Sequence, residues 1–244
     1  MRTPRFYQEI DVEIGQQQSL SALNHRHAIQ VLRLKVDEAL ILFDGKGGEY
    51  LAKISVVNKR ASSVLLESFN DVDRESALNS TLVLSTIKSD KMDFAIQKAV
   101  ELGVTNIQPM TSQRSVIKIK ADRMQKKLQH WQAIILGACE QSGRTQVPIL
   151  EEPVSLETAL KKHSSDFCIG MLPTSTEKFS DLKLTNEQQQ IALFIGPEGG
   201  FTKEEEQLMQ RYQINTVNFG SRIMRAETAV IAGLTACQQQ WGDL

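Results

Sequence analysis

Cysteine is scarce in this sequence, and its three residues, Cys139, Cys168 and Cys237, lie far apart. An odd number at such spacing forms neither a disulfide framework nor a zinc-ligand pattern, and it is typical of a reducing compartment. We therefore expect a cytoplasmic protein that binds no metal.

Long apolar runs are also missing. No stretch approaches the roughly 18 consecutive apolar residues of a membrane-spanning helix. The first fifteen residues, MRTPRFYQEIDVEIG, contain no apolar segment of the kind that signal peptides carry. We expect no membrane partner. With 244 residues, 41% hydrophobic and 23% charged, the composition is that of an ordinary globular protein of one or two domains.

An excess of positive charge is absent, because the formal net charge is −1. The charges are unevenly distributed, however. Residues 81–130 hold nine Lys or Arg against four Asp or Glu, whereas residues 151–244 hold eight against thirteen. A basic segment beside an acidic one is compatible with a phosphate-rich partner on one side of the protein, and equally with an ordinary solvated surface.

Residues 1–72 form the first predicted domain, and it is rich in β-structure. Apolar runs predict strands at 36–43 and 62–67, and the sequence DGKGG at 44–48 is typical of a turn after a strand. A short helix is expected over His25–Lys35. The polar stretch 70–79 lacks periodicity and is the expected linker, which places the domain boundary after residue 72.

Strands and helices alternate along residues 73–244. The continuous apolar run Thr81–Ile87 is typical of a strand buried on both faces. Asp90 is placed to cap a helix over Lys91–Leu102, and Gly103 is placed to end it. Further strands are expected at 104–109, 166–170, 190–195 and 216–219, and further helices at 121–141, 156–163, 203–212 and 225–241. This alternation predicts an α/β domain with a mostly parallel sheet.

The segment Leu193–Glu205, LFIGPEGGFTKEE, takes an apolar run through a glycine-rich turn into a helix. Thr202 and Glu205 have the spacing of a capping box at the helix start. No Lys-Ser/Thr pair follows the glycines, and Pro197 removes a backbone donor that a phosphate cradle would use. The spacing suits a neutral, nucleoside-like ligand, but a tight turn that needs glycine for its backbone also explains it.

Two other expected strand ends attract attention, at 170–173 and 220–228. The carboxyl ends of parallel strands meet at one edge of a sheet, where ligands bind. In the later segment Arg222, Arg225 and Glu227 crowd the turn into a helix, with the Thr228 hydroxyl beside them. Charges bunched in this way favour a site, although charged first turns of helices are also common on plain surfaces.

Cysteine and histidine chemistry gives weaker candidates. Cys139 could be a nucleophile, but no histidine neighbours it in the sequence, and a buried structural thiol explains it better. His25 and His27 flank Arg26 and could supply a general base, or could contact RNA at the surface.

Six motifs occur in order: HAIQVLRLKVDE, LFDGKGGEY, KSDKMDFAIQKAVELGVTNIQP, CEQSGR, LFIGPEGGFTKEE and FGSRIMRAETA. Together they resemble the bacterial RsmE family, S-adenosylmethionine-dependent enzymes that methylate a uracil N3 of 16S rRNA in the small ribosomal subunit. The resemblance covers nearly the whole chain. Met224 stands where the family pattern leads us to expect leucine, which is a volume-conserving difference.

The resemblance implies a PUA-like β-barrel over residues 1–72 and a SPOUT methyltransferase domain over residues 73–244, with a C-terminal trefoil knot and a homodimeric assembly. It implies S-adenosylmethionine as cofactor, bound in the knot by loops at three strand ends. The cofactor-binding residues implied are Leu172, Pro173, Gly196, Glu198, Gly199, Gly200, Phe219, Gly220, Ile223, Met224 and Thr228.

For catalysis we expect a cation that favours the uracil anion by stabilising charge on its oxygens. Arg225 is the first candidate, and Glu227 or Glu198 could accept the proton or orient the arginine. Glu198 could instead hold its loop by hydrogen bonds. For RNA phosphates we expect a set of basic residues: Arg2, Arg5, Arg26, Arg33, Arg114, Lys118 and Lys120.

Three alternatives remain open. A different SPOUT enzyme could methylate ribose or another base, and the knot loops alone do not exclude it. A ribosome-assembly factor could keep the RNA-binding barrel without catalysis, although it would not need a nucleoside pocket. A Rossmann-like methyltransferase would carry its glycine loop after the first strand of the domain, whereas these loops lie near the C-terminus.

Overall fold

The computed structural model of the protein describes residues 3–115, 117, 121–184 and 190–244. Its contacts divide the chain into two units. Unit 1 comprises Met1–Glu75 and Cys139–Val147, and unit 2 comprises Ser76–Ala138 and Pro148–Leu244. The predicted boundary after residue 72 assigned Cys139–Val147 to the second domain, whereas its contacts lie in unit 1.

Unit 1 is built on a five-stranded sheet in the order β1-β3-β4-β5-β2. Strands β1 and β3 are parallel, and the other pairs are antiparallel. The strands are β1 (Arg5–Tyr7), β2 (Gln17–Ser19), β3 (Ala39–Phe43), β4 (Glu49–Val57) and β5 (Ser62–Asn70). The DGKGG turn joins β3 to β4 as predicted, with Gly45, Gly47 and Gly48 at positive φ.

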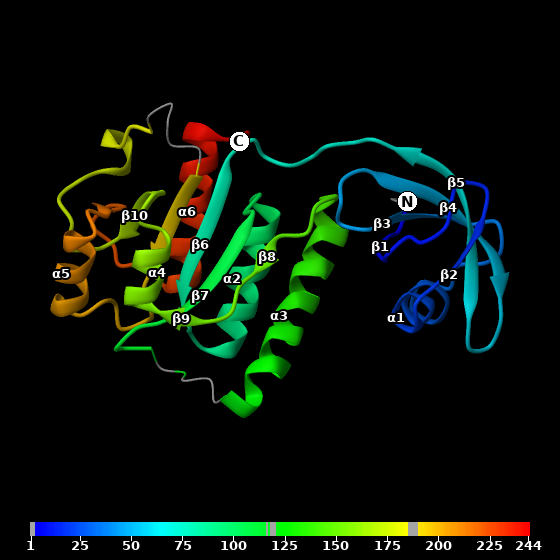
Figure 1. The fold of residues 1–244 in the computed structure, drawn as a ribbon, viewed down its shortest axis with the longest axis horizontal. Coiled ribbons are helices and arrows are strands. Elements are labelled where there is room, and N and C mark those ends of the chain that lie inside the picture. Colours follow the sequence, from blue (N-terminus) through cyan, green and yellow to red (C-terminus); the bar gives the residue numbers. More distant parts are fainter. Residues whose placement is uncertain (1–2, 116, 118–120, 185–189) are drawn as a thin grey trace. The chain divides into compact units, whose positions relative to one another are not determined.

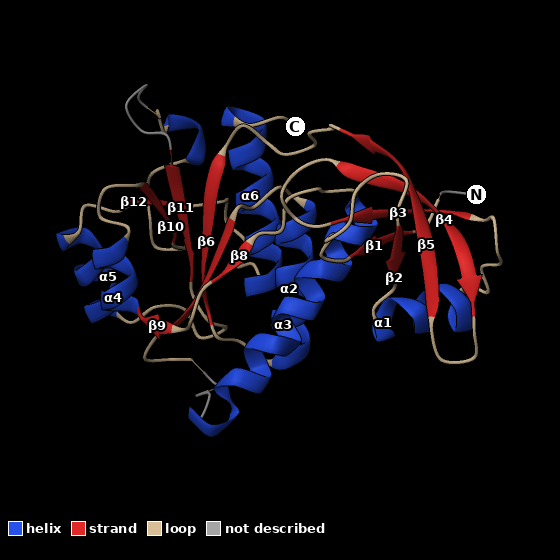
Figure 2. Cartoon of the chain, turned by 45° about the vertical axis from the view of Figure 1, so that its right-hand side comes forward, coloured by secondary structure: helices blue, strands red, loops and turns tan. Residues whose placement is uncertain are grey.

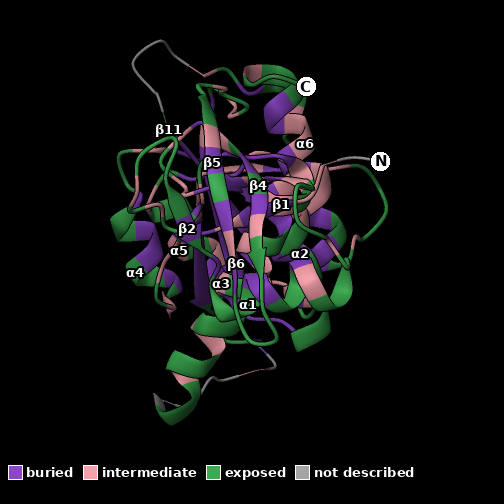
Figure 3. Ribbon diagram, turned by 90° about the vertical axis from the view of Figure 1, so that its right-hand side faces the viewer, coloured by how far each residue is buried: buried purple, intermediate pink, exposed green. Residues whose placement is uncertain are grey.

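Side chains alternate across this sheet, as Figure 3 shows along β4 and β5, where buried and more exposed positions follow one another. Such alternation is typical of a sheet with one face packed on a core and the other in water. Phe6, Leu40, Leu42, Ile54 and Leu66 fill that core and are at most 1% exposed.

The predicted helix over His25–Lys35 is wrong in form and length. The structure has a short α-helix, α1 (Ala22–His25), followed by a π-helical turn at Arg26–Val31. The Ser21 side chain caps α1 by accepting from the Asn24 backbone N–H at 3.1 Å. Arg33 ends the segment at φ +58°, an uncommon conformation for a residue other than glycine.

The segment Cys139–Val147 joins unit 1 through a polar network that is partly buried. Arg5 and Arg74 both bind the Glu49 carboxylate, and both donate to the Gly143 carbonyl oxygen, at 3.2 and 3.0 Å. Arg144 donates through Nε to Glu75 at 2.7 Å. The CEQSGR motif therefore serves the polar interior of unit 1, which its place in the sequence does not reveal.

Unit 2 is built on a sheet in the order β12-β10-β11-β6-β7-β8, and β9 also pairs with β7. All of these pairs are parallel, which agrees with the predicted mostly parallel sheet. The strands are β6 (Asn79–Ser85), β7 (Asn106–Thr111), β8 (Ile149–Leu150), β9 (Val154–Ser155), β10 (Phe167–Met171), β11 (Gln190–Ile195) and β12 (Asn215–Val217).

Helices cover both faces of this sheet. Figures 1 and 2 show α4 and α5 on one face and α2 and α6 on the other. The helices are α2 (Ser89–Glu101), α3 (Ala121–Ser142), α4 (Leu156–Lys162), α5 (Lys203–Arg211) and α6 (Ala226–Trp241), with a 3₁₀ turn at Phe179–Asp181. Within the described residues, no helix has both the length and the apolar character needed to cross a bilayer.

The predicted start of α5 is confirmed, and that of α2 is corrected. Thr202 and Glu205 form both hydrogen bonds of a capping box at α5. The N-cap of α2 is Lys88, so Asp90 lies inside the first turn, where its charge still favours the helix dipole. Gly103 follows the end of α2 at φ +80°, as expected for a helix-ending glycine.

Candidate functional site

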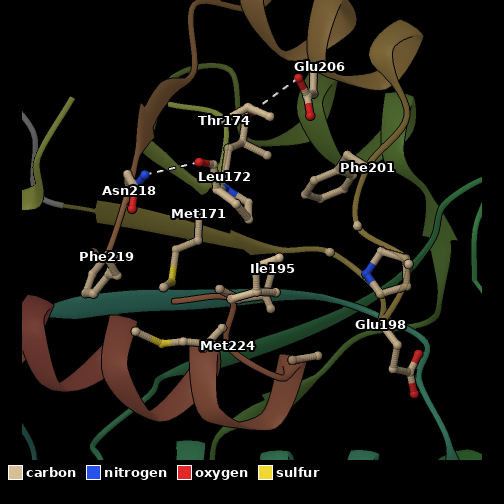
Figure 4. Close-up of a pocket in the computed structure, with 18 of the residues that line it drawn as sticks. Met171, Leu172, Thr174, Ile195, Glu198, Phe201, Glu206, Asn218, Phe219 and Met224 are labelled. Carbon is tan, nitrogen blue, oxygen red and sulfur yellow. Dashed lines mark hydrogen bonds between the residues drawn. The ribbon is translucent and has the colours of Figure 1, made fainter. Parts of the chain in front are cut away.

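The loops that follow β10, β11 and β12 surround one cavity of about 390 Å³. These strands are neighbours in the parallel sheet, so their carboxyl ends lie together at one edge. Figure 4 shows apolar side chains on its walls, among them Met171, Ile195, Phe201 and Met224. A concave, mostly apolar pocket with a few polar groups is typical of a small-molecule site.

Most of the residues expected to bind the cofactor line this cavity. Ten of the eleven do so: Leu172, Pro173, Gly196, Glu198, Gly199, Gly200, Phe219, Gly220, Ile223 and Met224. Thr228 lies exposed in the first turn of α6 and is not among the lining residues. Segments as far apart in the sequence as Leu172 and Met224 therefore meet here because of the order of the strands.

The glycines of the loop after β11 serve two different purposes. Gly200 has φ +66° and donates its N–H to the Pro197 carbonyl at 2.9 Å, so it forms the tight turn. Gly196 and Gly199 instead leave room for a neighbour. A Cβ on Gly196 would lie 3.0 Å from the Phe201 ring, and one on Gly199 would lie 3.2 Å from Arg114.

Glu198 lines the cavity, but its carboxylate is engaged elsewhere. Oε1 of Glu198 accepts from the Lys88 backbone N–H at 3.2 Å, at the N-cap of α2. Figure 4 shows the carboxylate turned away from the apolar walls. This bond ties the glycine-rich loop to the start of α2, in keeping with the loop-holding alternative for Glu198.

Glu227 does not line the cavity. It lies in the first turn of α6, only 7% exposed, and its carboxylate forms an ion pair with Lys91 of α2 at 3.3 Å. The start of α2 therefore binds two carboxylates, one from the loop after β11 and one from α6. Both were candidates for proton transfer.

Arg225 is the exposed N-cap residue of α6 and also lies outside the set of lining residues. Its neighbours Met224 and Ala226 do line the cavity. The backbone carbonyl of Arg225 accepts from the Ala229 N–H at 2.8 Å. The backbone of Arg225 is thus fixed at the start of α6, between two residues that line the cavity.

Sequence reasoning did not select several further lining residues: Met171, Thr174, Ile195, Phe201, Lys203, Glu206, Val217, Asn218, Ala226 and Ala229. Arg222, one of the charges that the sequence singled out, does line the cavity. Asn218 joins two loops, because its amide donates to the Pro173 carbonyl at 3.1 Å (Figure 4) and to the Ser175 carbonyl at 3.2 Å. Asn218 could have been predicted as a site residue from its position directly before Phe219, at the end of an expected strand.

The residues expected to contact RNA lie in different surroundings. Arg5 is only 8% exposed and belongs to the polar network of unit 1, which corrects its assignment to an RNA-contacting surface. Arg26 and Arg33 are exposed. Arg114 lines the cavity and binds backbone carbonyls. Arg2, Lys118 and Lys120 lie outside the described residues.

The histidine and cysteine candidates for catalysis make contacts that stabilise the fold. His25 is buried, with Nδ1 3.0 Å from the Ser62 hydroxyl, whereas His27 is exposed and meets the Phe6 ring edge-on. Burial raises the pKa of Cys139 to about 12, which fits a structural thiol and not a nucleophile. The described part of the chain contains no cluster of three metal-ligating side chains.

Comparison with known proteins identifies the family. The sequence profile described as "RNA methyltransferase domain" matches residues 74–238, and that of the "RNA methyltransferase PUA domain" matches residues 25–67. The chain belongs to the RNA methyltransferase family. The family predicted from the six motifs is confirmed, as is the α/β fold with a PUA domain.

Individual relatives agree with this family over their full length. Ribosomal RNA small subunit methyltransferase E of Buchnera aphidicola is 32% identical over 244 residues, covering all of this chain and 98% of the relative. The methyltransferase of the same name from Neisseria gonorrhoeae, solved with S-adenosyl methionine bound, is 38% identical with a TM-score of 0.92. A Legionella pneumophila methyltransferase, solved with SAM, is 36% identical with a TM-score of 0.96. Each of these two similarities extends over the whole of this chain and the whole of the solved chain.

Proposed function

We propose that this RNA methyltransferase transfers the methyl group of S-adenosylmethionine to N3 of one uridine in the 16S rRNA of the small ribosomal subunit. One observation carries the proposal: the loops after β10, β11 and β12 enclose a single cavity at the carboxyl edge of the sheet. Two relatives with 36% and 38% identity were solved with this cofactor bound.

The cavity suits a nucleoside-bearing cofactor in size and chemistry. Its volume of about 390 Å³ falls within the range of roughly 300–1,000 Å³ for small-molecule sites. Apolar side chains such as Leu172, Ile195 and Phe219 would pack against a base. Backbone groups of Gly196 and Gly220 lie at its wall, where they would bind polar edges of the base and ribose.

Bound S-adenosylmethionine would supply an electrophilic methyl group on a sulfonium, so transfer requires no covalent intermediate on the protein. The protein must place uracil N3 in line with that methyl group and favour loss of its proton. Arg225, exposed at the start of α6, would stabilise negative charge on O2 or O4 of the base.

The two carboxylates would then have different roles. Glu198 would chiefly hold the glycine-rich loop through its bond to the Lys88 N–H, and only its other oxygen, turned away from the apolar walls, is left to accept the N3 proton through water. Glu227 is buried and paired with Lys91, so it would orient the first turn of α6, which carries Arg225.

The family resemblance also supports a trefoil knot formed by the C-terminal segment and a homodimeric assembly, both of which stay predictions. An rRNA substrate would place the activity in the cytoplasm. Light scattering on the full chain would test the dimer, since a mass near twice 27.4 kDa is expected.

The decisive experiment is methyl transfer from labelled S-adenosylmethionine to small ribosomal subunits that lack the modification, followed by nucleoside analysis. Label in 3-methyluridine at a single rRNA site is the expected result. Label in a ribose-methylated nucleoside or in another base would instead assign the protein to a different SPOUT activity. Cofactor binding measured alongside separates an inactive enzyme from a non-catalytic assembly factor.

A further inference from the structure

Arg114 binds the glycine-rich loop, although it belongs to a different strand end from the one that carries the loop. Its Nη1 donates to the backbone carbonyl of Gly199 at 2.9 Å and to that of Phe201 at 3.2 Å. The arginine follows β7, whereas the loop follows β11, and β6 lies between these strands in the sheet. Both contacts are charge-assisted hydrogen bonds, which are stronger than neutral ones.

The arginine stem and Gly199 fit each other closely. A Cβ on Gly199 would lie 3.2 Å from Cβ and 3.3 Å from Cδ of Arg114, which is tighter than ordinary packing. Gly199 has no positive φ that would require glycine for its backbone conformation. Glycine at this position therefore lets the arginine approach, and the two residues form one structural unit.

The segment that carries Arg114 is itself held in place. The Gln113 backbone N–H donates to Oε1 of Glu205 at 2.7 Å, while Oε2 of the same carboxylate accepts from the Thr202 N–H at 2.9 Å. The hydroxyl of Ser112 lies 3.0 Å from those of Ser85 and Ser115. Arg114 thus extends from a fixed base at the ends of β6 and β7.

We infer that Arg114 is a positioning residue that holds the loop Gly196–Phe201 in the shape that binds the cofactor. This inference rests on the proposed function, because it assigns a role within the same cavity. The loop contains three glycines, so its backbone loses much conformational freedom when it is ordered. Without the arginine, a smaller fraction of molecules has the binding shape, and the apparent affinity falls by that fraction.

The test measures binding of S-adenosylmethionine to the full chain by calorimetry. Arg114→Met keeps the length of the stem but removes the donors, and it raises Kd by roughly tenfold, the equivalent of one charge-assisted hydrogen bond. Arg114→Lys retains a cation that can bind one of the two carbonyls, so its Kd lies between those of wild type and Arg114→Met. Arg123→Met, at an exposed arginine early in α3, is the matched control and leaves Kd unchanged.

Kinetics separates positioning from a general structural defect. With small ribosomal subunits as substrate, Arg114→Met raises KM for the cofactor while kcat at saturating cofactor stays within about twofold of wild type. The melting temperature without cofactor also stays that of the Arg123→Met control. An unchanged Kd in Arg114→Met, or a loss confined to kcat, would overturn the inference.

A double-mutant cycle tests the fit between the two residues. Gly199→Ala weakens cofactor binding in the wild-type background but less in the Arg114→Ala background, because the truncated side chain no longer presents Cδ to the new methyl group. Additive effects would contradict the inference. If the wild-type chain binds no S-adenosylmethionine, the proposed function is wrong. If the wild type and all variants bind the cofactor equally well, only the role inferred for Arg114 is wrong.

Discussion

At the residue scale, Glu49 shows how one buried carboxylate organises the polar interior of unit 1. It is 6% exposed and accepts hydrogen bonds from Arg5 and Arg74. Burial acts to raise the pKa of Glu49, but the hydrogen bonds from Arg74 and Arg5 outweigh it and hold the pKa below its usual value of 4.5. The carboxylate is therefore ionised in the folded protein at neutral pH.

We expect Glu49→Gln to lower the free energy of unfolding of unit 1 by about 3 kcal/mol, because it leaves a buried guanidinium without its counter-charge. The folded-state pKa lies below the unfolded one, so the stabilisation by Glu49 is present above pH 4.5 and is lost as the pH falls through the lower folded value. Urea unfolding at several pH values checks this.

The matched control for this change is Glu67→Gln, which removes the partly exposed ion pair with Lys53. We expect it to cost at most about 1 kcal/mol, since surface ion pairs contribute little. Equal costs for the two variants, or an unaltered acid dependence in Glu49→Gln, would contradict the role assigned to Glu49.

Arg225→Ala tests the cation proposed for the reaction. We expect kcat to fall by roughly a hundredfold, because a charge that stabilises the developing anion is lost. The Kd for S-adenosylmethionine should change little, since Arg225 does not line the cavity. Arg211→Ala, at an exposed arginine that ends α5, is the control. Parallel losses of cofactor binding and of transfer would make Arg225 a binding or folding residue.

At the element scale, the start of α5 depends on its capping box. Thr202→Ala removes the side-chain oxygen that accepts from the Glu205 N–H, and we expect it to lower stability by about 1 kcal/mol. For a chain of this size, that corresponds to a fall in melting temperature of roughly 2–4 °C. Thermal unfolding measures it, and Thr202→Ser should retain most of the wild-type stability.

The start of α2 holds two parts of the site through Lys88 and Lys91. Lys91→Met leaves the Glu227 carboxylate buried without its cation, which we expect to cost about 1–2 kcal/mol because the lysine is partly exposed. Adding Glu227→Gln removes the unpaired charge, so the double variant should recover part of that stability. Thermal unfolding of the four proteins measures the coupling, and strictly additive losses would rule out an energetic link between α2 and α6.

Periodicity predicted whether a segment forms a helix or a strand. The residues at which helices begin and end depended on contacts that periodicity does not show. The apolar run of β6 and the capping box of α5 identified a strand and a helix start. The prediction for segment 25–35 was wrong, because its apolar residues have the spacing of an α-helix whereas the structure forms a π-helical turn. Asp90 has the chemistry of an N-cap, but Glu198 binds the Lys88 N–H from another strand end, and the helix begins earlier.

At the scale of the whole molecule, we expect the exposed arginines of unit 1 to contribute to binding of the small ribosomal subunit. Arg26→Gln with Arg33→Asn should weaken binding and reduce the slope of log K against log salt by roughly 0.7–0.9 for each phosphate that is no longer neutralised. Asparagine is chosen at 33 because it tolerates the left-handed backbone there. An unchanged slope would exclude these two residues, and Lys59→Gln, at an exposed lysine, is the control.

The family, the alternation of strands and helices, and the three segments that supply the cavity could all be predicted from the order of the residues. These features are encoded locally, in apolar periodicity, turn residues and motifs. Which charged residues belong to the site, and which stabilise the interior, depends on the packing of the folded chain. Arg5, Arg114 and Glu227 are ordinary charged residues in the sequence, and the packing of strands and helices brings each beside a partner between 44 and 136 positions away. The role of a charged side chain depends on the residues that pack against it, and packing between distant segments of the chain determines which residues those are.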